Sequence, residues 1–248
     1  MKVTAVVETE ADNRLDIGEL GRPGGVGIRC QGVVHLYRTF EGHDVVALQG
    51  VDLTIQPGER VAFLGPSGSG KSTLLTLLGG IQKPSAGRIF LGDDEISRMG
   101  ERYLARIRSR RVSTMLQGST RNLLPYATAR QNIAFARLAL SSAERRGALL
   151  DTDLLRRVGL EQQADQVVST MSGGQRQRLA LACAVSTSPQ LLLADEPTSQ
   201  LSHEDRDHVV SLERLVQVHE PLAPDGEPTG PPGQLLGDVL HCALLPMT

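Results

Sequence analysis

The chain lacks most of the sequence features of secreted proteins, of proteins stabilised by a bound metal and of membrane-spanning proteins. Its 248 residues include no tryptophan and three cysteines. These cysteines, Cys30, Cys183 and Cys242, lie far apart and form neither a metal-binding spacing nor an even disulfide framework. This cysteine usage argues against a disulfide-stabilised secreted domain and favours a reducing compartment.

Long apolar runs and an excess of basic charge are also missing. No apolar run reaches the roughly 18 residues of a membrane-spanning helix, and the acidic stretch 8–12 is unlike a signal peptide. The formal net charge is −2, so counterion release would contribute little to binding a nucleic acid. We therefore expect no nucleic-acid partner, a cytoplasmic location and, at most, peripheral association with a membrane.

Lysine is scarce as well, which makes the position of one lysine informative. Only three of the 26 basic residues are lysines, and Lys71 lies in a glycine-rich segment between the apolar runs 61–64 and 74–78. A buried strand, a glycine-rich turn and an apolar helix form the setting in which G-x-x-x-x-G-K-[ST] predicts a phosphate-binding loop. The alternative is a glycine-rich turn with an incidental lysine, and the flanking apolar runs argue against it. The predicted nucleotide-binding residues are Gly65, Pro66, Ser67, Gly68, Ser69, Gly70, Lys71, Ser72 and Thr73.

These residue types suit the chemistry of a polyphosphate. Glycines carry no Cβ, so the loop can wrap phosphates with its N–H groups pointing inward. The helix predicted to start near Gly70 adds unpaired N–H groups and the positive end of its dipole. Lys71 can reach the β and γ phosphates of ATP, and the Ser72 hydroxyl can bind Mg²⁺.

A second segment carries a pair of carboxylates. Asp195 and Glu196 follow the continuous apolar run 191–194, as expected for a buried central strand that ends in acids beside the phosphate loop. Asp195 is predicted to hold Mg²⁺, directly or through water, and Glu196 to orient or deprotonate the attacking water. A strand that ends in a solvated acidic turn is the alternative, which the phosphate loop disfavours.

A third segment, Ser172-Gly173-Gly174-Gln175, precedes the acidic strand by one predicted helix, from about residue 175 to residue 186. Ser172 suits the N-cap position, so the glycines and the helix dipole would form a second anion site. An ordinary capped helix with a glycine-rich entry is the alternative. Because one nucleotide needs one phosphate cradle, we hypothesise that two copies arranged head to tail offer this site to each other's ATP.

Composition divides the chain into three parts. Residues 1–27 are expected to be a flexible N-terminal extension, and residues 215–248 a proline- and glycine-rich divergent tail with little order. Residues 28–214 carry strand patterns at 28–37, 45–55 and 88–91, then helix-like spacing from about 97 to 166. The expected fold class is α/β: a P-loop NTPase core with an N-terminal antiparallel β subdomain and a helical insertion subdomain.

In its order of motifs, the chain resembles the ATP-binding-cassette (ABC) transporter ATPases over about residues 29–213. The motifs are the phosphate loop, then Gln117, then residues 172–175, then residues 195–196. Residues 77–80 and 122–125 are most similar to the subgroup that serves lipoprotein release and macrolide export. The resemblance implies an ATP-hydrolysing subunit that energises an integral-membrane permease, pairs with a second ATPase subunit and lies on the cytoplasmic face of the plasma membrane.

The resemblance also assigns two further site residues. Tyr37 lies upstream of the phosphate loop, where the family carries an aromatic that stacks on adenine. A tyrosine in the strand core is the alternative. Gln117 matches the family's glutamine that contacts Mg²⁺ and the attacking water and senses the membrane partner.

Two departures from the family's pattern bear on hydrolysis. Ser202 stands where the family usually has aspartate, and the histidine that contacts the γ phosphate has no clear counterpart. His219 follows Glu196 too soon, and His241 follows no β-branched run. The tail after residue 214 is either divergent or the product of a truncation or frame change, and the abrupt loss of the family pattern favours the second.

These departures keep a second function open, an ATP-binding regulatory or degenerate subunit with weak hydrolysis. A third class, the soluble ABC proteins of DNA repair or translation, is disfavoured. The chain has no tandem second cassette, no long coiled-coil insertion and no basic excess.

Overall fold

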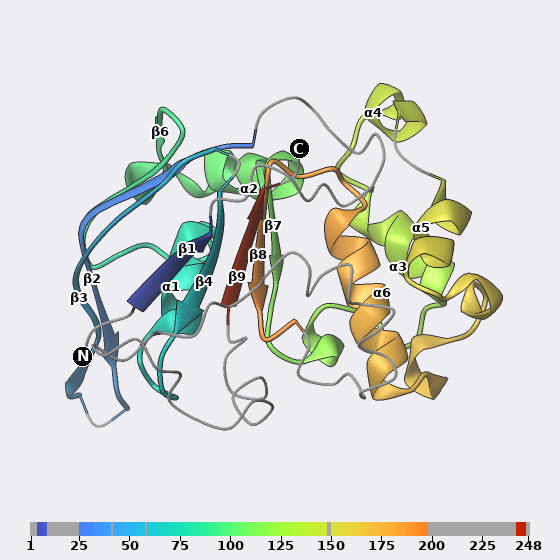
Figure 1. Ribbon diagram of the computed structural model, residues 1–248, viewed down its shortest axis with the longest axis horizontal. Coiled ribbons are helices and arrows are strands. Elements are labelled where there is room, and N and C mark those ends of the chain that lie inside the picture. Colours follow the sequence, from blue (N-terminus) through green and yellow to red (C-terminus); the bar gives the residue numbers. More distant parts are fainter. Residues whose placement is uncertain are drawn as a thin grey trace, which may run out of the picture.

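Two β-sheets and two groups of helices make up the fold (Figure 1). The computed structural model describes residues 4–8, 25–40, 42–57, 59–147, 150–197 and 242–246, with the backbone alone for the first and last of these ranges. Within this part of the chain, no helix combines the length and apolarity needed to cross a membrane. The α/β architecture expected from the sequence is confirmed.

The larger sheet brings the functional segments together. Its strand order is β1-β4-β9-β8-β7, and β7 runs parallel to β8. Strand β9 is antiparallel to both of its neighbours, β4 and β8, so these two strands run in the same direction. The carboxyl ends of β4, β7 and β8 therefore meet at one edge of the sheet, where α/β proteins bind their ligands. In chain order the strands are β1 (Thr4–Glu8), β4 (Arg60–Leu64), β7 (Val112–Met115), β8 (Leu191–Asp195) and β9 (Cys242–Pro246).

The smaller sheet is antiparallel throughout, with the order β3-β2-β5-β6. It confirms the predicted N-terminal antiparallel subdomain and the three strands expected from the alternation of apolar residues. Its strands are β2 (Ile28–Arg38), β3 (Asp44–Ile55), β5 (Ala86–Leu91) and β6 (Asp94–Glu95).

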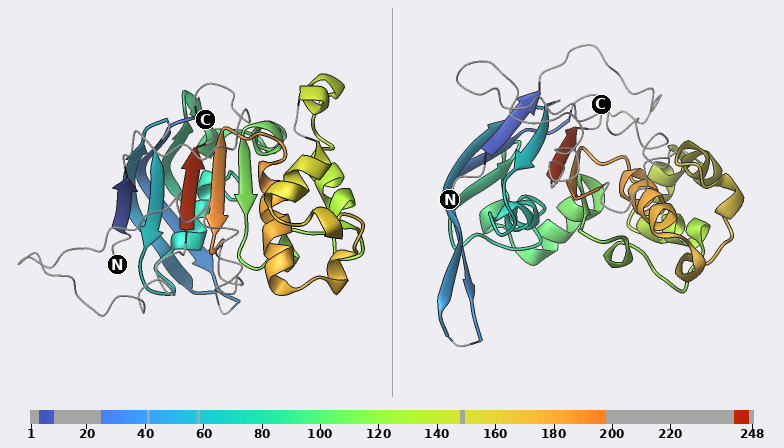
Figure 2. Two further views of the ribbon diagram at one scale, coloured as in Figure 1. Left: turned by 45° about the vertical axis from the view of Figure 1, so that its right-hand side comes forward. Right: turned by 60° about the horizontal axis from the view of Figure 1, so that its bottom comes forward.

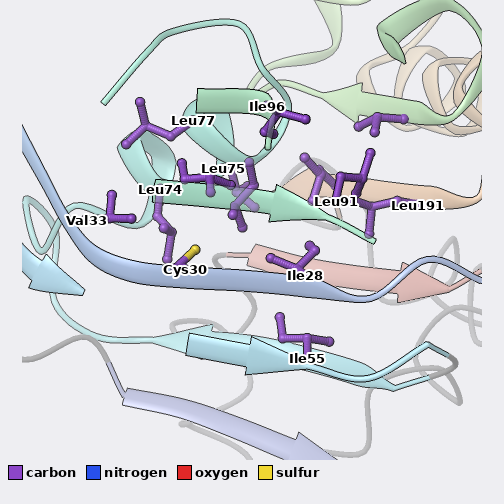
Figure 3. Close-up of a cluster of buried hydrophobic side chains, with 14 of the residues drawn as sticks. Ile28, Cys30, Val33, Ile55, Leu74, Leu75, Leu77, Leu91, Ile96 and Leu191 are labelled. Atoms are coloured by element: carbon purple, nitrogen blue, oxygen red, sulfur yellow. The ribbon is translucent and has the colours of Figure 1, made fainter. Parts of the chain in front are cut away.

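Helix α1 (Lys71–Leu78) packs its apolar side chains into the core that joins the two sheets. Figure 3 shows Leu74 and Leu75 of α1 gathered with Cys30 of β2 and Leu191 of β8. Each of these side chains is at most 4% exposed. The apolar run that follows the phosphate loop thus anchors the loop on both sheets.

Leu104 and Ile107 of α2 (Glu101–Arg110) belong to the same core as α1. The helices from α3 (Ala129–Ala136) onward form a second body beside the larger sheet (Figure 2), with its own apolar core. Arg137 ties this body together, because its guanidinium donates to Asp151 Oδ1 at 2.6 Å and to the Ser186 carbonyl at 3.0 Å. The longer helices are α2 (Glu101–Arg110), α3 (Ala129–Ala136), α4 (Ser142–Gly147), α5 (Asp151–Arg157) and α6 (Gly173–Val185). Short 3-10 helices are η1 (Ile96–Arg98), η2 (Ser119–Arg121), η3 (Glu161–Gln163) and η4 (Val168–Thr170).

Three strands depart from the sequence-based expectations. Strand β7 interrupts the stretch from 97 to 166 that was expected to be helical, because a run of four residues is too short to show a period. Strands β1 and β9 lie within the segments expected to be a flexible extension and a tail of little order. Both are strands because of backbone pairing with partners far away in the sequence. The domain boundaries at residues 28 and 214 stay predictions.

Candidate functional site

The loop from residue 65 to residue 70 joins the end of β4 to the start of α1, as the sequence predicts. Lys71, the first residue of α1, is buried. Its Nζ donates to the Gly65 carbonyl at 2.5 Å, to the Pro66 carbonyl at 2.9 Å and to Ser69 Oγ at 3.3 Å. The loop thus surrounds the ammonium group with its own oxygen acceptors. Phosphate oxygens accept hydrogen bonds in the same way and carry more negative charge, so they can take the place of these acceptors.

Two glycines give this loop its shape. Gly68 and Gly70 have φ angles of 76° and 91°, in the region that side chains disfavour. Gly70 is also the N-cap of α1, and a Cβ on it would lie 2.6 Å from the Ala47 carbonyl oxygen and 2.8 Å from Leu48 Cδ2. Glycine at this position therefore satisfies both the backbone angle and the close approach of α1 to β3.

Tyr37 lies on β2 beside the start of α1. Its hydroxyl donates to Gln82 Oε1 at 3.0 Å and lies 3.3 Å from Thr73 Oγ1. The rings of Tyr37 and His35 form a T-shaped pair, with centroids 4.7 Å apart and an interplanar angle of 85°. Tyr37 is 39% exposed, so it is not a core residue, and these contacts hold its ring next to the helix that carries the phosphate loop.

The carboxylates lie at the edge where β4, β7 and β8 end. Asp195 is the last residue of β8 and is buried. Glu196 follows with a φ of 49°, a conformation that costs a residue with a side chain about 1–2 kcal/mol. Strain of this kind persists only where the surroundings hold it, and it clusters at functional sites.

Gln117 reaches the same edge from β7, and its side chain is exposed. Asn122 holds the loop around it. The Asn122 side chain accepts from the Leu116 N–H at 2.9 Å, and it donates to the Leu116 carbonyl at 2.7 Å and the Gly118 carbonyl at 3.1 Å. The sequence had singled out Asn122 only as part of a subgroup pattern. Asparagine side chains often hydrogen-bond the backbone of nearby loop residues, so an asparagine five residues after Gln117 could have indicated that it holds this loop.

The third segment, at the start of α6, adopts the predicted capped helix. Ser172 is the N-cap, and its Oγ accepts from the Gln175 N–H at 3.1 Å while Gln175 Oε1 accepts from the Ser172 N–H at 2.8 Å. The capping box does not use the N–H groups of Gly173 and Gly174. By helix geometry these two groups have no acceptor within α6. The helix begins two residues earlier than predicted, at Gly173.

The structure also brings Gln177 of α6 against the backbone that follows Asp195, which sequence reasoning missed. Its Nε2 donates to the Pro197 carbonyl at 2.6 Å. Ser202, His219 and His241 lie outside the described residues, so the two departures from the family pattern stay predictions. Strand β9 begins directly after His241, and its first residue pairs with Asp195.

These segments define a class of site, a P-loop nucleotide-binding site at the edge of a mixed sheet where three strands of the same direction end. No three His, Cys, Asp or Glu side chains gather into a metal site within the described ranges. The Ser72 hydroxyl, the Asp195 carboxylate and the Gln117 amide oxygen are nevertheless ligands of the kind that Mg²⁺ takes together with phosphate oxygens. The residues present therefore fit Mg²⁺ bound with a nucleotide.

Comparison with known proteins identifies the family. The ABC transporter family matches residues 48–199, which include the phosphate loop, Gln117, the start of α6 and both carboxylates. The chain therefore belongs to the ABC transporter family. It is an ATP-binding, ATP-hydrolysing subunit of that family, as the order of its motifs predicted.

Curated relatives agree with this assignment and with the predicted subgroup. The lipoprotein-releasing system ATP-binding protein LolD of Chromohalobacter salexigens is 37% identical over 186 residues, covering 75% of this chain and 77% of the relative. LolD of Pseudomonas syringae is 42% identical over 174 residues, covering 68% and 74%. The methionine import ATP-binding protein MetN of Xanthomonas oryzae is 37% identical over 189 residues, covering 76% and 55%.

Solved structures agree on the fold. A dimeric ATP-binding cassette in a post-hydrolysis state, bound to ADP and Pi, has a TM-score of 0.64 and 31% identity. The likeness covers 81% of this chain and 85% of that one. A second dimeric structure of the same cassette, described as a bacterial ABC transporter cassette, gives a TM-score of 0.65 at 30% identity and covers 76% of this chain and 82% of that one. These dimers support pairing of ATPase subunits in this family.

Proposed function

We propose that the chain hydrolyses Mg²⁺-bound ATP with the residues gathered at the carboxyl edge of the larger sheet. One observation carries the proposal: β4, β7 and β8 run in the same direction and end at one edge of the larger sheet. These ends carry the phosphate loop, Gln117 and the pair Asp195 and Glu196. A phosphate anchor and a general base must lie within reach of one substrate, and the shared edge meets that requirement.

Each side chain has a distinct task in this proposal. The N–H groups of the loop and of the start of α1 bind phosphate oxygens, and Lys71 donates to the β and γ phosphates. Tyr37 stacks on the adenine. The Glu196 carboxylate accepts a proton from the attacking water, which the Gln117 amide orients. Mg²⁺, when bound by Ser72, Asp195 and Gln117, supplies positive charge to the phosphates.

We further propose that the start of α6 serves the nucleotide of a second subunit. The N–H groups of Gly173 and Gly174, the Ser172 cap and Gln175 then face the γ phosphate held by the partner's phosphate loop. The capping box supports this arrangement, because it fixes these groups at the positive end of a 13-residue helix. The dimeric form of the similar cassettes also supports it.

The partner is an integral-membrane permease, and we propose that the chain binds it at the cytoplasmic face of the plasma membrane. We propose a permease of the lipoprotein-releasing kind, since the LolD relatives match over 74–82% of their own length. A MetN relative matches over 55% of its length and makes methionine import the second candidate. Reconstitution of this chain with each candidate permease in vesicles separates the two. In the first case the release of a lipoprotein from the membrane must depend on this chain and ATP, and in the second case the uptake of methionine must do so.

Ser202 and the missing histidine favour a second function, a regulatory subunit that binds ATP and turns it over poorly. The test is the ATPase rate of the purified chain, alone and with its permease. We expect turnover that Glu196→Gln lowers by about 100-fold or more while ATP still binds. Lys71→Ala, in contrast, should abolish binding. Turnover near the background rate in the wild-type chain with its permease would favour the regulatory function instead.

A further inference from the structure

Gln177 makes an unusual pair of contacts one turn inside α6. Its side chain is 2% exposed, and its Nε2 donates to the Pro197 carbonyl at 2.6 Å and to the Glu196 carbonyl at 3.3 Å. Both acceptors are carbonyl oxygens, so only the amide nitrogen can make these contacts, and the orientation of the amide is determined. Its Oε1 has no hydrogen-bond partner within the described part of the chain. The donor contacts therefore explain why this amide is buried here.

The contacts act on the backbone of the proposed base. The ladder of β8 ends at Asp195, and Glu196 then turns into the left-handed region with a φ of 49°. The carbonyl of Glu196 and that of the next residue both accept from Gln177. Strain of this kind persists where the surroundings hold it, and the two hydrogen bonds from Gln177 hold the turn that carries Glu196.

The same helix begins at the second anion site. Ser172 caps α6, and Gln177 lies five residues further along, about 7.5 Å by helix geometry. A hydrogen-bonded helix moves as a unit over this distance. A shift of Ser172 on contacting a nucleotide therefore reaches the backbone of Glu196 through the Gln177 side chain.

We propose that Gln177 is a positioning residue that couples the partner's nucleotide at Ser172 to Glu196 of its own chain, so that each subunit's base is aimed only when the other subunit's ATP is seated. This inference rests on the proposed function, because it takes Glu196 as the base and Ser172 as the contact to the partner's ATP. It adds to that function a residue through which the two sites act on each other.

Gln177→Met is the first test, since methionine has a similar length and no donor. We expect kcat to fall by about 10- to 100-fold, with the KM for ATP within about twofold of wild type. Gln190→Met is the matched control. Gln190 accepts from Arg111 at 2.8 Å at the opposite end of β8, outside the site, so its loss should leave kcat unchanged. Gln177→Asn, which keeps the amide but withdraws it by one methylene, should behave like Gln177→Met.

Mixed dimers of differently tagged chains separate positioning from a general loss of structure. One chain carries Glu196→Gln, so turnover comes from the other chain's intact Glu196. Placing Gln177→Met on the chain with the intact Glu196 should lower the remaining turnover by the factor seen in the uniform variant. Placing it on the Glu196→Gln chain should leave that turnover unchanged. Equal losses in the two arrangements would overturn the proposal.

Hydrogen exchange provides a measurement that does not depend on turnover. The peptide that covers residues 191–197 should exchange faster in Gln177→Met than in wild type and Gln190→Met. Equal exchange in all three proteins would overturn the inference even if mixed dimers show no activity. If Glu196→Gln leaves turnover intact, the proposed function fails. If that variant is inactive and Gln177→Met behaves as wild type, only the present inference fails.

Discussion

Gly70 lies where the start of α1 meets the backbone of β3, and this contact decides which residues the phosphate loop tolerates. A side chain at position 70 would meet the Ala47 carbonyl, which cannot move without disturbing the strand. Gly70 belongs to the loop whose N–H groups are proposed to bind phosphate, so a displacement of its backbone also displaces these N–H groups.

Gly70→Ala should therefore weaken ATP binding. In the free variant the loop relaxes away from the left-handed φ, and returning to it on binding ATP costs about 1–2 kcal/mol, which corresponds to about a tenfold loss of affinity. The contact with Ala47 adds to this cost. Titration calorimetry with ATP measures the loss. Gly100→Ala is the matched control, because Gly100 has a φ of −71° and nothing lies within 4 Å of the added Cβ. Equal affinity of the two variants would contradict the steric role of Gly70.

Single residues differed in how well the sequence revealed them. The places of Lys71 at the start of α1 and of Asp195 and Glu196 at the end of β8 were predicted from strands and glycines of recognisable pattern, and their roles stay predictions. Asn122 and Gln177 act through amide hydrogen bonds to backbone carbonyls. Any glutamine or asparagine can make such bonds, so only the contacts in the folded chain reveal which ones do.

At the scale of elements, β9 is a strand that the sequence pattern did not predict. It fills the position between β4 and β8 and pairs with both, with Leu244 opposite Val61 and Leu193. A strand of five residues after a proline-rich stretch carries no period from which to predict it. The same holds for β7. Longer elements such as β2, β3 and α1 were predicted close to their observed ends.

Leu244→Pro tests the role of β9 in the sheet. Proline removes an N–H from a strand paired on both sides, and each buried backbone group left unpaired costs about 1–3 kcal/mol. The free energy of unfolding, measured with urea, should fall by that amount. Leu150→Pro is the control, because Leu150 is exposed and already has a φ of −61°. An unchanged midpoint for Leu244→Pro would mean that β9 does not contribute to the stability of the sheet.

At the scale of the whole molecule there are two apolar cores within the described residues, and a buried thiol lies in each. Cys30 belongs to the core between the sheets and Cys183 to the core of the helical body. Burial raises the pKa of each thiol from 9.0 to about 12. In the unfolded chain the thiols ionise near their ordinary pKa. Rising pH therefore lowers the free energy of the unfolded state before it lowers that of the folded state.

Stability should therefore be unaffected by these thiols below pH 9 and should fall between about pH 9 and 12, by up to about 1.4 kcal/mol per pH unit for each thiol. Urea unfolding at pH 8, 9, 10 and 11 in the presence of a reductant measures this slope. The double variant Cys30→Ala and Cys183→Ala should lose free energy of unfolding more slowly with pH, although its starting value is lower. Equal slopes for the two proteins would show that the thiols are not buried in both cores.

The sequence by itself determined the nucleotide chemistry, the family and the order of the motifs. The reason is that phosphate binding requires particular residue types within a few positions of one another. The tertiary structure decided which strands stand side by side, and with them the common edge where the phosphate loop, Gln117 and the carboxylates meet. It also decided the contact of Gln177 with the backbone after Glu196. Strand β9 pairs with β4, whose residues lie more than 100 positions away, and with β8, and no local pattern encodes such neighbours.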